Sequence, residues 1–405
     1  MLRRAFPLWL VALFFAACMT ACSSNGAVPA PGGAAGSGGT TGGGGGASAT
    51  GFKQPLLGLI DMQDISWHDT EGGEPTFTLA NISQFTPGTF GGIVINATWD
   101  KMQPTQNGQL VTSQIDTALA AIQAYNTQNP AHQLGAKLRI YSSSSAPLWV
   151  QQLGGATPIP IQRNPGGCSS GNCPLTIGKF WDPTYIAAWQ TFQAMVAAKY
   201  DSNPIVRAVA VTSCTSQTDE PFVPTTDKTS KANLIAAGYT DGAYQSCLSG
   251  APADYKAWKT TLIDYSFNTF VSMQVGGTNP TFTANTMAAC RNSLGAQCVL
   301  DNHDLMEPTN PNDSIVYSTM PTLSGPINFQ TQAPRGMGCQ WTATIARGIQ
   351  LGASAIEIWP AFQGFTTLTS PNMISLASLF TNPIAVPAVP NPLPTANCVG
   401  FNPTS

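Results

Sequence analysis

Five glutamates are available to this 405-residue chain for acid–base chemistry: Glu71, Glu74, Glu220, Glu307 and Glu357. A pair of carboxyl groups can act as general acid and base, or as acid and nucleophile. Glu71 and Glu74 stand beside a Gly-Gly turn and are expected to be solvated, and Glu307 lies downstream of its strand. The two best-placed candidates for catalysis are therefore Glu220 and Glu357.

The two candidates stand in different surroundings. Glu220 follows Asp219 in a loop after a predicted strand. Glu357 lies inside a predicted strand between two isoleucines, where a charge is costly unless it is paired. Its natural partner is Arg139, and such a pair would hold Glu357 ionised, as a nucleophile requires. If Glu357 is sealed against Arg139 away from solvent, its role is structural instead.

Polar and aromatic residues gather at the ends of the predicted strands, which is typical of a sugar-binding site. Carboxylates and amides bind hydroxyl groups, and aromatic faces stack on sugar rings. The predicted substrate-binding residues are Asp61, Trp99, Arg139, Tyr141, Asp219, Asp301, His303, Gln330 and Trp359. Asp301 or Glu307 is the alternative second carboxylate if Glu357 is structural.

Eight short apolar runs predict the buried strands that would position these residues. The runs are Leu56–Met62, Gly92–Trp99, Lys137–Ser142, Ala208–Cys214, Thr261–Phe267, Cys298–Asn302, Ile327–Thr331 and Ala355–Trp359. Helical patterns lie between them, including one opened by Asp182 and Pro183 and a short one at Asp254–Lys259. This alternation predicts an α/β fold, a single (β/α)8 TIM barrel whose strand ends converge on one mouth. An open doubly wound sheet is the alternative, but no Gly-x-Gly-x-x-Gly turn follows the first strand.

The predicted barrel occupies residues 51–383, and a Pro-rich tail at 384–405 is expected to pack on it. Two connections are longer than usual, 151–180 after the third strand and 215–250 after the fourth. In a barrel these long loops would lie over the mouth.

The first 50 residues predict export and anchoring. Residues 1–22 begin with two arginines, continue with an apolar stretch too short for a permanent membrane span, and end in a lipobox-like Thr-Ala-Cys. Cys22 is the predicted lipidation site, with Cys18 as a weaker candidate and an ordinary cleaved signal as the alternative. Residues 23–50 are a flexible Gly-, Ala- and Ser-rich linker. These features predict a lipid-anchored protein of the bacterial cell envelope or cell surface.

Charge is scarce in this chain: 9% of its residues are charged, against roughly 25% in an average soluble domain, and the net charge is −3. Without a basic excess, the chain is not expected to bind nucleic acid. The hydrophobic fraction of 43% is ample for a core and argues against a long disordered chain. We expect a monomer whose partners are a carbohydrate substrate and, through the lipid anchor alone, a membrane.

Eight cysteines remain after the leader, and an even number in an exported chain favours disulfides. Local spacing favours the pairs Cys168–Cys173 and Cys290–Cys298, which leaves Cys214–Cys247 and Cys339–Cys398. A zinc site is the alternative, but no pair has the Cys-x2-Cys spacing and the three histidines are isolated. No metal and no cofactor is predicted.

Four sequence features suggest a family. They are Gly-Ile-Val-Ile-Asn-Ala-Thr-Trp-Asp on the second strand, Phe-Trp-Asp-Pro at residues 180–183, Asp-Glu after the fourth strand and a Trp ending the eighth. Over most of residues 55–380 the chain thereby resembles the retaining glycoside hydrolases of clan A. The resemblance implies that Glu220 is the general acid/base, with Asp219 where the clan has Asn. The clan's nucleophile is a Glu at the end of the seventh strand, and the run Ile327–Gln332 holds no carboxylate there.

The predicted function is that of a glycoside hydrolase-like enzyme that cleaves an extracellular poly- or oligosaccharide, with Glu220 as proton donor and Glu357 as second carboxylate. The alternative is a non-catalytic carbohydrate-binding lipoprotein on the same barrel, which the missing seventh-strand acid favours. A metal-dependent hydrolase is a third possibility without diagnostic spacing, and it would use Asp61, His68, Asp301 and His303.

Overall fold

The structure of the chain is a computed structural model that describes residues 51–62, 64–66, 76–78, 82, 85–162, 174–224, 226–332, 340–358 and 370–388. All of these belong to one compact unit, residues 42–405. Ten residues singled out in the sequence lie outside the described ranges, and the predictions made for them stay predictions: Cys18, Cys22, His68, Glu71, Glu74, Cys168, Cys173, Cys339, Trp359 and Cys398.

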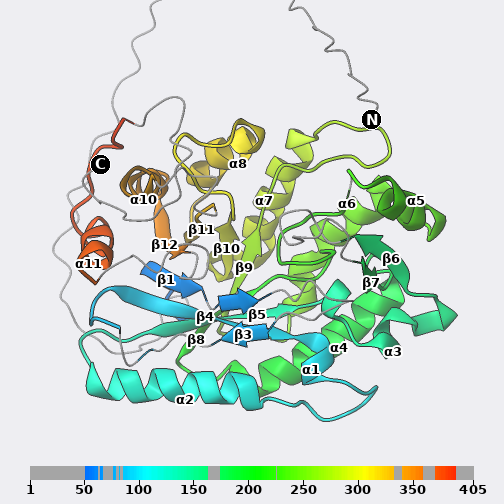
Figure 1. Cartoon of the computed structure of the whole chain (residues 1–405), viewed down its shortest axis with the longest axis horizontal. Coiled ribbons are helices and arrows are strands. Elements are labelled where there is room, and N and C mark those ends of the chain that lie inside the picture. The colour runs from blue at the N-terminus through cyan, green and yellow to red at the C-terminus, as the bar shows by residue number, and fades with distance from the viewer. Residues whose placement is uncertain are drawn as a thin grey trace, which may run out of the picture. The chain divides into compact units, whose positions relative to one another are not determined.

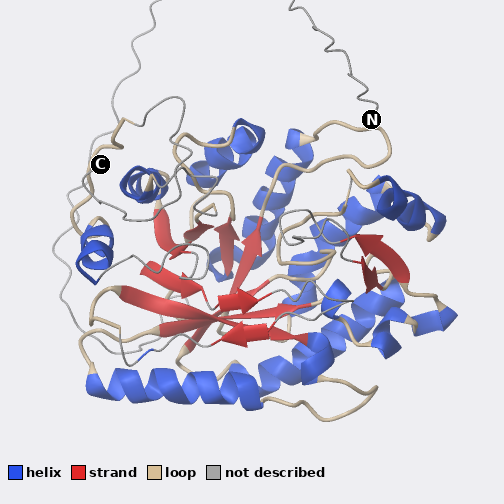
Figure 2. Cartoon of the chain, in the orientation of Figure 1, coloured by secondary structure: helices blue, strands red, loops and turns tan. Residues whose placement is uncertain are grey.

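Eight parallel strands of the described residues close into a barrel (Figures 1 and 2). In chain order they are β1 (Gly58–Met62), β4 (Phe90–Thr98), β5 (Gly135–Tyr141), β8 (Val206–Ala210), β9 (Leu262–Ser266), β10 (Cys298–Asp301), β11 (Ile327–Gln330) and β12 (Ala353–Ile358). Each strand pairs with the next, and β12 pairs with β1 to close the ring. The predicted (β/α)8 fold is confirmed, and each of the eight predicted strands matches a barrel strand.

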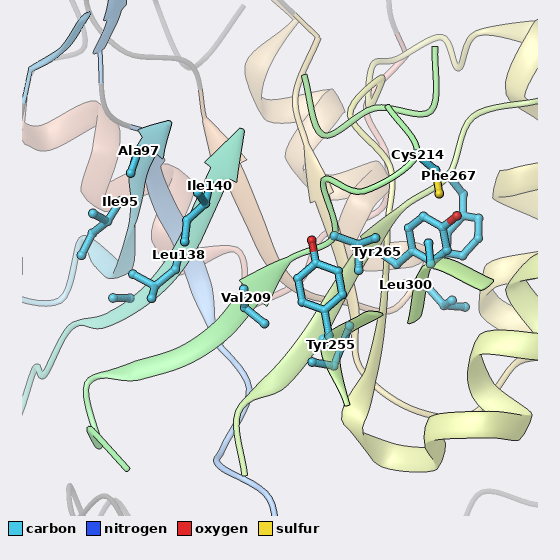
Figure 3. Close-up of a cluster of buried hydrophobic side chains, with 14 of the residues drawn as sticks. Ile95, Ala97, Leu138, Ile140, Val209, Cys214, Tyr255, Tyr265, Phe267 and Leu300 are labelled. Atoms are coloured by element: carbon cyan, nitrogen blue, oxygen red, sulfur yellow. The ribbon is translucent and has the colours of Figure 1, made fainter. Parts of the chain in front are cut away.

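Side chains alternate between the two faces of the barrel wall. The outward layer is apolar and includes Ile95, Ala97, Leu138, Ile140 and Val209 (Figure 3). Burying one such aliphatic side chain is worth about 1.5–3 kcal/mol, so this layer contributes strongly to stability. A second apolar cluster lies on the inward face, from β1, β4 and β12 and the segment before β1: Leu56, Ile60, Met62, Val94 and Ala355. Further along the strands the inward positions become polar.

Helices connect the strands and cover the outside of the barrel (Figure 2). The longer ones outside the β8–β9 connection are α2 (Ser113–Gln128), α4 (Pro183–Tyr200), α7 (Pro280–Leu294), α10 (Trp341–Gln350) and α11 (Ser370–Ser378). In Figure 1, α2 lies against β4 and α10 against β12. The Asp182 side chain accepts a hydrogen bond from the Thr184 backbone N–H, and Pro183 takes the first helical position of α4.

The connection after β8 contains two helices that the sequence did not predict. They are α5 (Lys228–Ala236) and α6 (Asp241–Gly250). The helix predicted at Asp254–Lys259 is wrong, because a 3-10 turn at Ala251–Tyr255 stands there. With β9 beginning at Leu262, the connection is too short for another α-helix, and the Tyr255 hydroxyl is held in the core by the Thr212 N–H.

Two of the predicted disulfides are confirmed. Cys214–Cys247 ties α6 to the end of β8, and Cys290–Cys298 ties α7 to β10. The other two predicted pairs lie outside the described residues.

Several short elements complete the described part of the chain. They are the helices α1 (Trp99–Met102), α3 (Leu148–Gln151) and α8 (Ser314–Thr319), and the antiparallel pairs β2 (Asp64–Ser66) with β3 (Thr76–Thr78) and β6 (Ile159–Gln162) with β7 (Pro174–Ile177). Within the described residues, no helix combines the length and apolarity that a membrane crossing needs.

Candidate active site at the carboxyl end of the barrel

A buried ammonium group organises the polar interior of the barrel. Lys137 on β5 points inward and contacts three carboxylates at once: Asp264 on β9 at 2.7 Å, Asp301 on β10 at 2.8 Å and Glu357 on β12 at 2.5 Å. Burial lowers the pKa of Lys137, but these three carboxylates raise it well above its ordinary value. Lys137 is therefore a permanent cation that joins four strands of the wall.

Arg139 carries this network from the barrel interior to the loop after β8. Its Nη2 lies 2.5 Å from Glu357 Oε2, and its Nε lies 2.5 Å from Asp219 Oδ2. Arg139 stands two residues after Lys137 on β5, so the alternation of the strand places both cations on the inward face. The guanidinium thereby fixes Asp219, the neighbour of Glu220, relative to the barrel wall.

His303 makes a second connection between the network and this loop. Its Nε2 lies 3.1 Å from Asp301 Oδ2, and its Nδ1 lies 3.6 Å from Asp219 Oδ1. Burial lowers the pKa of His303, but Asp219 and Asp301 raise it to about 9. The imidazole is therefore a cation at neutral pH.

The charges of the network balance if one acid keeps its proton. The three cations are Lys137, Arg139 and His303, and they face four acids: Asp219, Asp264, Asp301 and Glu357. Burial and the neighbouring acids Asp301 and Glu357 raise the pKa of Asp264 well above its ordinary value, whereas Lys137 and His303 hold that of Asp301 low. Asp264 is therefore the acid that keeps its proton. The network then holds three positive and three negative charges.

Glu220 stands beside this network in a less enclosed position. It follows Asp219 in the loop after β8 and is partly exposed to solvent. Burial raises the pKa of Glu220, the His303 cation lowers it, and Asp219 and Asp304 raise it again, so that the net pKa is about 7. A carboxyl group that titrates near neutral pH and reaches solvent can donate a proton to a bound ligand.

Asp219 differs from its neighbour in charge. Burial raises its pKa, but Arg139 and His303 pull it below the ordinary value. Two adjacent carboxyl groups thus hold different protonation states near pH 7, with Glu220 exchanging its proton and Asp219 ionised. Such a split is the pattern by which environments assign acid and base roles.

The structure brings most of the predicted site residues together in the barrel interior. These are Arg139, Tyr141, Asp219, Asp301, His303, Gln330 and Glu357, all buried, with Glu220 at their edge. The Tyr141 hydroxyl lies 3.4 Å from Asn96 Oδ1 on the neighbouring strand, and Gln330 ends β11. Their roles in substrate binding stay predictions, but their placement at one end of the barrel supports a single site.

Glu357 lies in the buried, ion-paired environment that the sequence analysis linked to a structural role. It is 1% exposed, and both of its oxygens contact cations, Oε1 with Lys137 and Oε2 with Arg139. This is the environment of an internal counter-ion. The catalytic role of Glu357 stays a prediction that this geometry does not support.

Two predicted substrate-binding residues point away from the interior. On β1, Ile60 and Met62 belong to the inward apolar cluster and Leu59 to the outward one, so Asp61 shares the outward face. The inward orientation expected for Asp61 is wrong. The even-numbered residues of β1 point inward, whereas the prediction required the odd-numbered ones to do so.

Trp99 is also not available to a ligand. It is 0% exposed and packs between the barrel and the helices against Trp149, Tyr185, Trp189 and Phe192. Its indole N–H donates to the side chain of Gln103 at 3.0 Å. The prediction that Trp99 stacks on a sugar is therefore wrong, because the chain turns into α1 after β4 and carries the ring outward.

Two acids of the site were missed by the sequence reasoning. Asp264 lies in the middle of the apolar strand β9, and that misplaced charge was the signal that could have revealed it. Asp304 follows His303, accepts hydrogen bonds from Asn310 and Gln332, and has its pKa raised by burial to about 6. It acts on the titration of Glu220 and so belongs to the site.

No group of three or more His, Cys, Asp or Glu side chains that could hold a metal ion is found in the part of the chain that the structure describes. The carboxylates of the barrel are instead neutralised by Lys137, Arg139 and His303.

Comparisons with known proteins give structural likeness alone. No family model matches the sequence, and no curated protein matches it. Among solved structures, endoglycoceramidase II from Rhodococcus sp. is 13% identical with a TM-score of 0.43, covering 75% of this chain and 73% of its own. The β-mannanase of the blue mussel Mytilus edulis is 11% identical (TM-score 0.42, 73% and 81% covered), as is an endo-β-1,4-glucanase from Xanthomonas axonopodis pv. citri (TM-score 0.35, 81% and 100% covered).

Proposed function

We propose that this protein is a glycoside hydrolase-like enzyme that cleaves an extracellular poly- or oligosaccharide, with Glu220 as its general acid. The observation that carries the proposal is the partly exposed Glu220 carboxyl group, whose pKa burial raises to about 7 at the carboxyl end of a (β/α)8 barrel. Active sites of this fold lie at that end of the barrel. A glycosidic bond breaks when its oxygen receives a proton as the bond to the anomeric carbon opens.

Asp219 supplies the negative charge that this chemistry needs. As the bond opens, positive charge develops at the anomeric carbon, and an ionised carboxylate nearby stabilises it. Arg139 and His303 keep Asp219 ionised and hold both of its oxygens in place. In this proposal Glu357 acts through Arg139, as a positioning residue that fixes the guanidinium from the opposite strand.

The other acids considered as second carboxylate are engaged elsewhere. Asp301 is 0% exposed and contacts Lys137 and His303. Glu307 accepts a hydrogen bond from the Arg347 guanidinium at 2.7 Å. Asp219 is also held by cations, but it is the ionised carboxylate next to Glu220 in the chain, and this position makes it the favoured partner.

A panel of aryl glycosides and polysaccharides tests the proposal. Glu220→Gln is expected to lower kcat/KM by 10²–10⁴-fold, which is the usual contribution of general acid catalysis. Asp116→Asn is the matched control, because it removes an exposed acid that pairs with Lys199 on the outer helices. Equal turnover by the wild type and Glu220→Gln would contradict the assignment of Glu220.

One observation favours a second candidate function, a carbohydrate-binding protein without catalysis. In the clan that the sequence resembles, the nucleophile ends the seventh barrel strand, and here β11 ends in the amide Gln330. The same panel separates the two functions, because a binding protein retains oligosaccharides without turning them over, and Glu220→Gln then changes nothing.

We infer in addition that the protein is exported and anchored by lipid in the bacterial cell envelope. The support is the leader and linker sequence of residues 1–50, which lie outside the described residues. Cys22→Ala is expected to move the protein from the membrane fraction to the soluble fraction, and unchanged fractionation would contradict the anchor.

A further inference from the structure

A cavity of about 710 Å³ lies at the amino-terminal end of the barrel, opposite the candidate active site. Its walls come from the segment before β1, the start of β4, the start of β8 and the region of α11. The volume falls in the range of about 300–1,000 Å³ that is typical of small-molecule sites. The proposed glycosidase chemistry makes no use of this cavity.

The cavity holds a guanidinium without a counter-ion. Arg207 on β8 lines it, is only partly exposed, and has no hydrogen bond or ion pair with any other residue that the structure describes. Its side chain runs across Gly135, where an added Cβ would lie 2.7 Å from Arg207 Cδ and 2.9 Å from Nε. Burial lowers the pKa of Arg207, but a guanidinium keeps its charge in proteins. The missing side chain at position 135 thus leaves room for an enclosed positive charge.

A second cation strengthens the positive field. Lys53 lines the cavity, and its ammonium donates to the carbonyls of Asn203 and Val206 and to the Thr261 hydroxyl, with no carboxylate among these partners. Asp201 is the one acid among the described lining residues. Its oxygens already accept hydrogen bonds from backbone N–H groups of residues 259–261. The cavity therefore has a surplus of positive charge.

A buried hydroxyl also lacks a partner there. Thr89 is 3% exposed, and its Oγ1 has no hydrogen bond in the described structure. The remaining wall is mixed: polar side chains such as His132 and Gln133 stand beside the apolar residues Leu57, Phe90 and Phe380. Leu57 is 57% exposed.

We propose that this cavity binds a small organic anion, with a carboxylate or phosphate group on Arg207 and an apolar portion against Leu57, Phe90 and Phe380. The planar guanidinium matches both anions with paired hydrogen bonds. The charges of Lys53 and Asp201 oppose each other, so the net positive charge of the cavity is that of Arg207. The apolar part of the wall removes the aliphatic part of the ligand from water. The site is independent of Glu220.

Thermal unfolding of the full chain with added ligands tests the site, because a ligand that binds the folded state raises Tm with its concentration. The probes are hexanoate, hexyl phosphate, inorganic phosphate and neutral hexan-1-ol. We expect hexanoate and hexyl phosphate to raise Tm in a saturable manner, with inorganic phosphate and hexan-1-ol at least tenfold weaker. The stronger of the two hexyl anions identifies the carboxylate or the phosphate as the natural group.

Substitutions distinguish the effect of the Arg207 charge on ligand binding from a general effect on the fold. Arg207→Gln is expected to raise the apparent Kd for both hexyl anions at least tenfold. Arg347→Gln removes the same charge from a residue that does not line the cavity and is expected to leave the Kd unchanged. Leu57→Ser alters an exposed side chain, keeps the fold, and is expected to weaken hexanoate while leaving inorganic phosphate unaffected. The proposal is overturned if no anion raises the wild-type Tm, if hexan-1-ol binds as well as hexanoate, or if Arg207→Gln binds as the wild type does.

Discussion

Replacing Lys137 by Gln removes the cation that neutralises the interior of the barrel. The ammonium lies 2.7 Å from Asp264, 2.8 Å from Asp301 and 2.5 Å from Glu357, and its side chain is 0% exposed. An amide of similar size keeps the volume but loses the charge. Up to three buried acids then lack their main partner.

The size of the stability loss in Lys137→Gln depends on the burial of the ion pairs as well as on their length. At 2.7 Å and an effective dielectric constant of about 20, one such pair attracts by about 6 kcal/mol, and the cost of desolvating the two charges offsets most of that gain. Removing one partner of a buried pair leaves the other charge uncompensated and costs about 3–5 kcal/mol. We expect Lys137→Gln to lose this amount from a total stability of about 5–15 kcal/mol.

Urea unfolding at pH 7 measures the effect, and Lys199→Gln provides the control. Lys199 pairs with Asp116 at the same 2.7 Å, but the two side chains are 42% and 44% exposed. Exposed pairs contribute about 0–1 kcal/mol. The two variants therefore break an ion pair of equal length in different surroundings.

The pH dependence supplies a second test. The orphaned carboxyl groups of Lys137→Gln can take up protons, so its loss of stability relative to the wild type is expected to shrink as the pH falls from 7 towards 4. A loss within 1 kcal/mol of the Lys199→Gln value at pH 7, or a loss that grows on acidification, would refute the reasoning.

Further predictions concern the acid, the histidine, a disulfide and a corrected tryptophan. Because Glu220 must carry its proton to act as an acid, kcat/KM is expected to fall as the pH rises through about 7, and a pH–rate profile that is flat between pH 6 and 8 would contradict this. The pKa of His303 is raised to about 9 from its ordinary 6.5. Protonated His303 therefore contributes up to about 3 kcal/mol to the free energy of unfolding, fully below pH 6.5 and no longer once the pH has risen through 9. Urea unfolding should show the stability difference between His303→Gln and the wild type closing over that range. The double variant Cys214→Ser/Cys247→Ser opens a loop of 33 residues and is expected to lose about 3.7 kcal/mol by chain entropy, measured by the same unfolding assay. Trp99→Ala empties a fully buried ring site and should cost about 3–5 kcal/mol without changing the affinity for oligosaccharides, which calorimetric titration can check.

The barrel could be predicted from the sequence because buried parallel strands are continuous apolar runs. Each run was short and bounded by loop or helix signals, so the number and order of the strands followed directly. The helices α5 and α6 were missed, because the segment Lys228–Gly250 is rich in polar and small residues and shows only a weak apolar periodicity. Their stability comes from packing and from the Cys214–Cys247 disulfide, which local patterns do not reveal.

The phase of a strand was harder to predict than its existence. A shift of one residue exchanges the inward and outward faces, and β1 is apolar on both. That is why the face of Asp61 was predicted wrongly. On β5 the phase is plain from the sequence, because the polar side chains of Lys137, Arg139 and Tyr141 alternate with Leu138 and Ile140.

By itself the sequence determined an eight-stranded barrel, a scarcity of charge, and two candidate glutamates, one inside a buried strand and one in the loop after another. Only the tertiary structure decided what those glutamates do. Lys137 and its three acids are 127, 164 and 220 residues apart in the chain, and closure of the barrel is what brings them within contact. That closure surrounds Glu357 with two cations and leaves Glu220 partly exposed beside an ionised Asp219, because the pKa of a carboxyl group is set by the charges and solvent around it, which the order of residues does not contain.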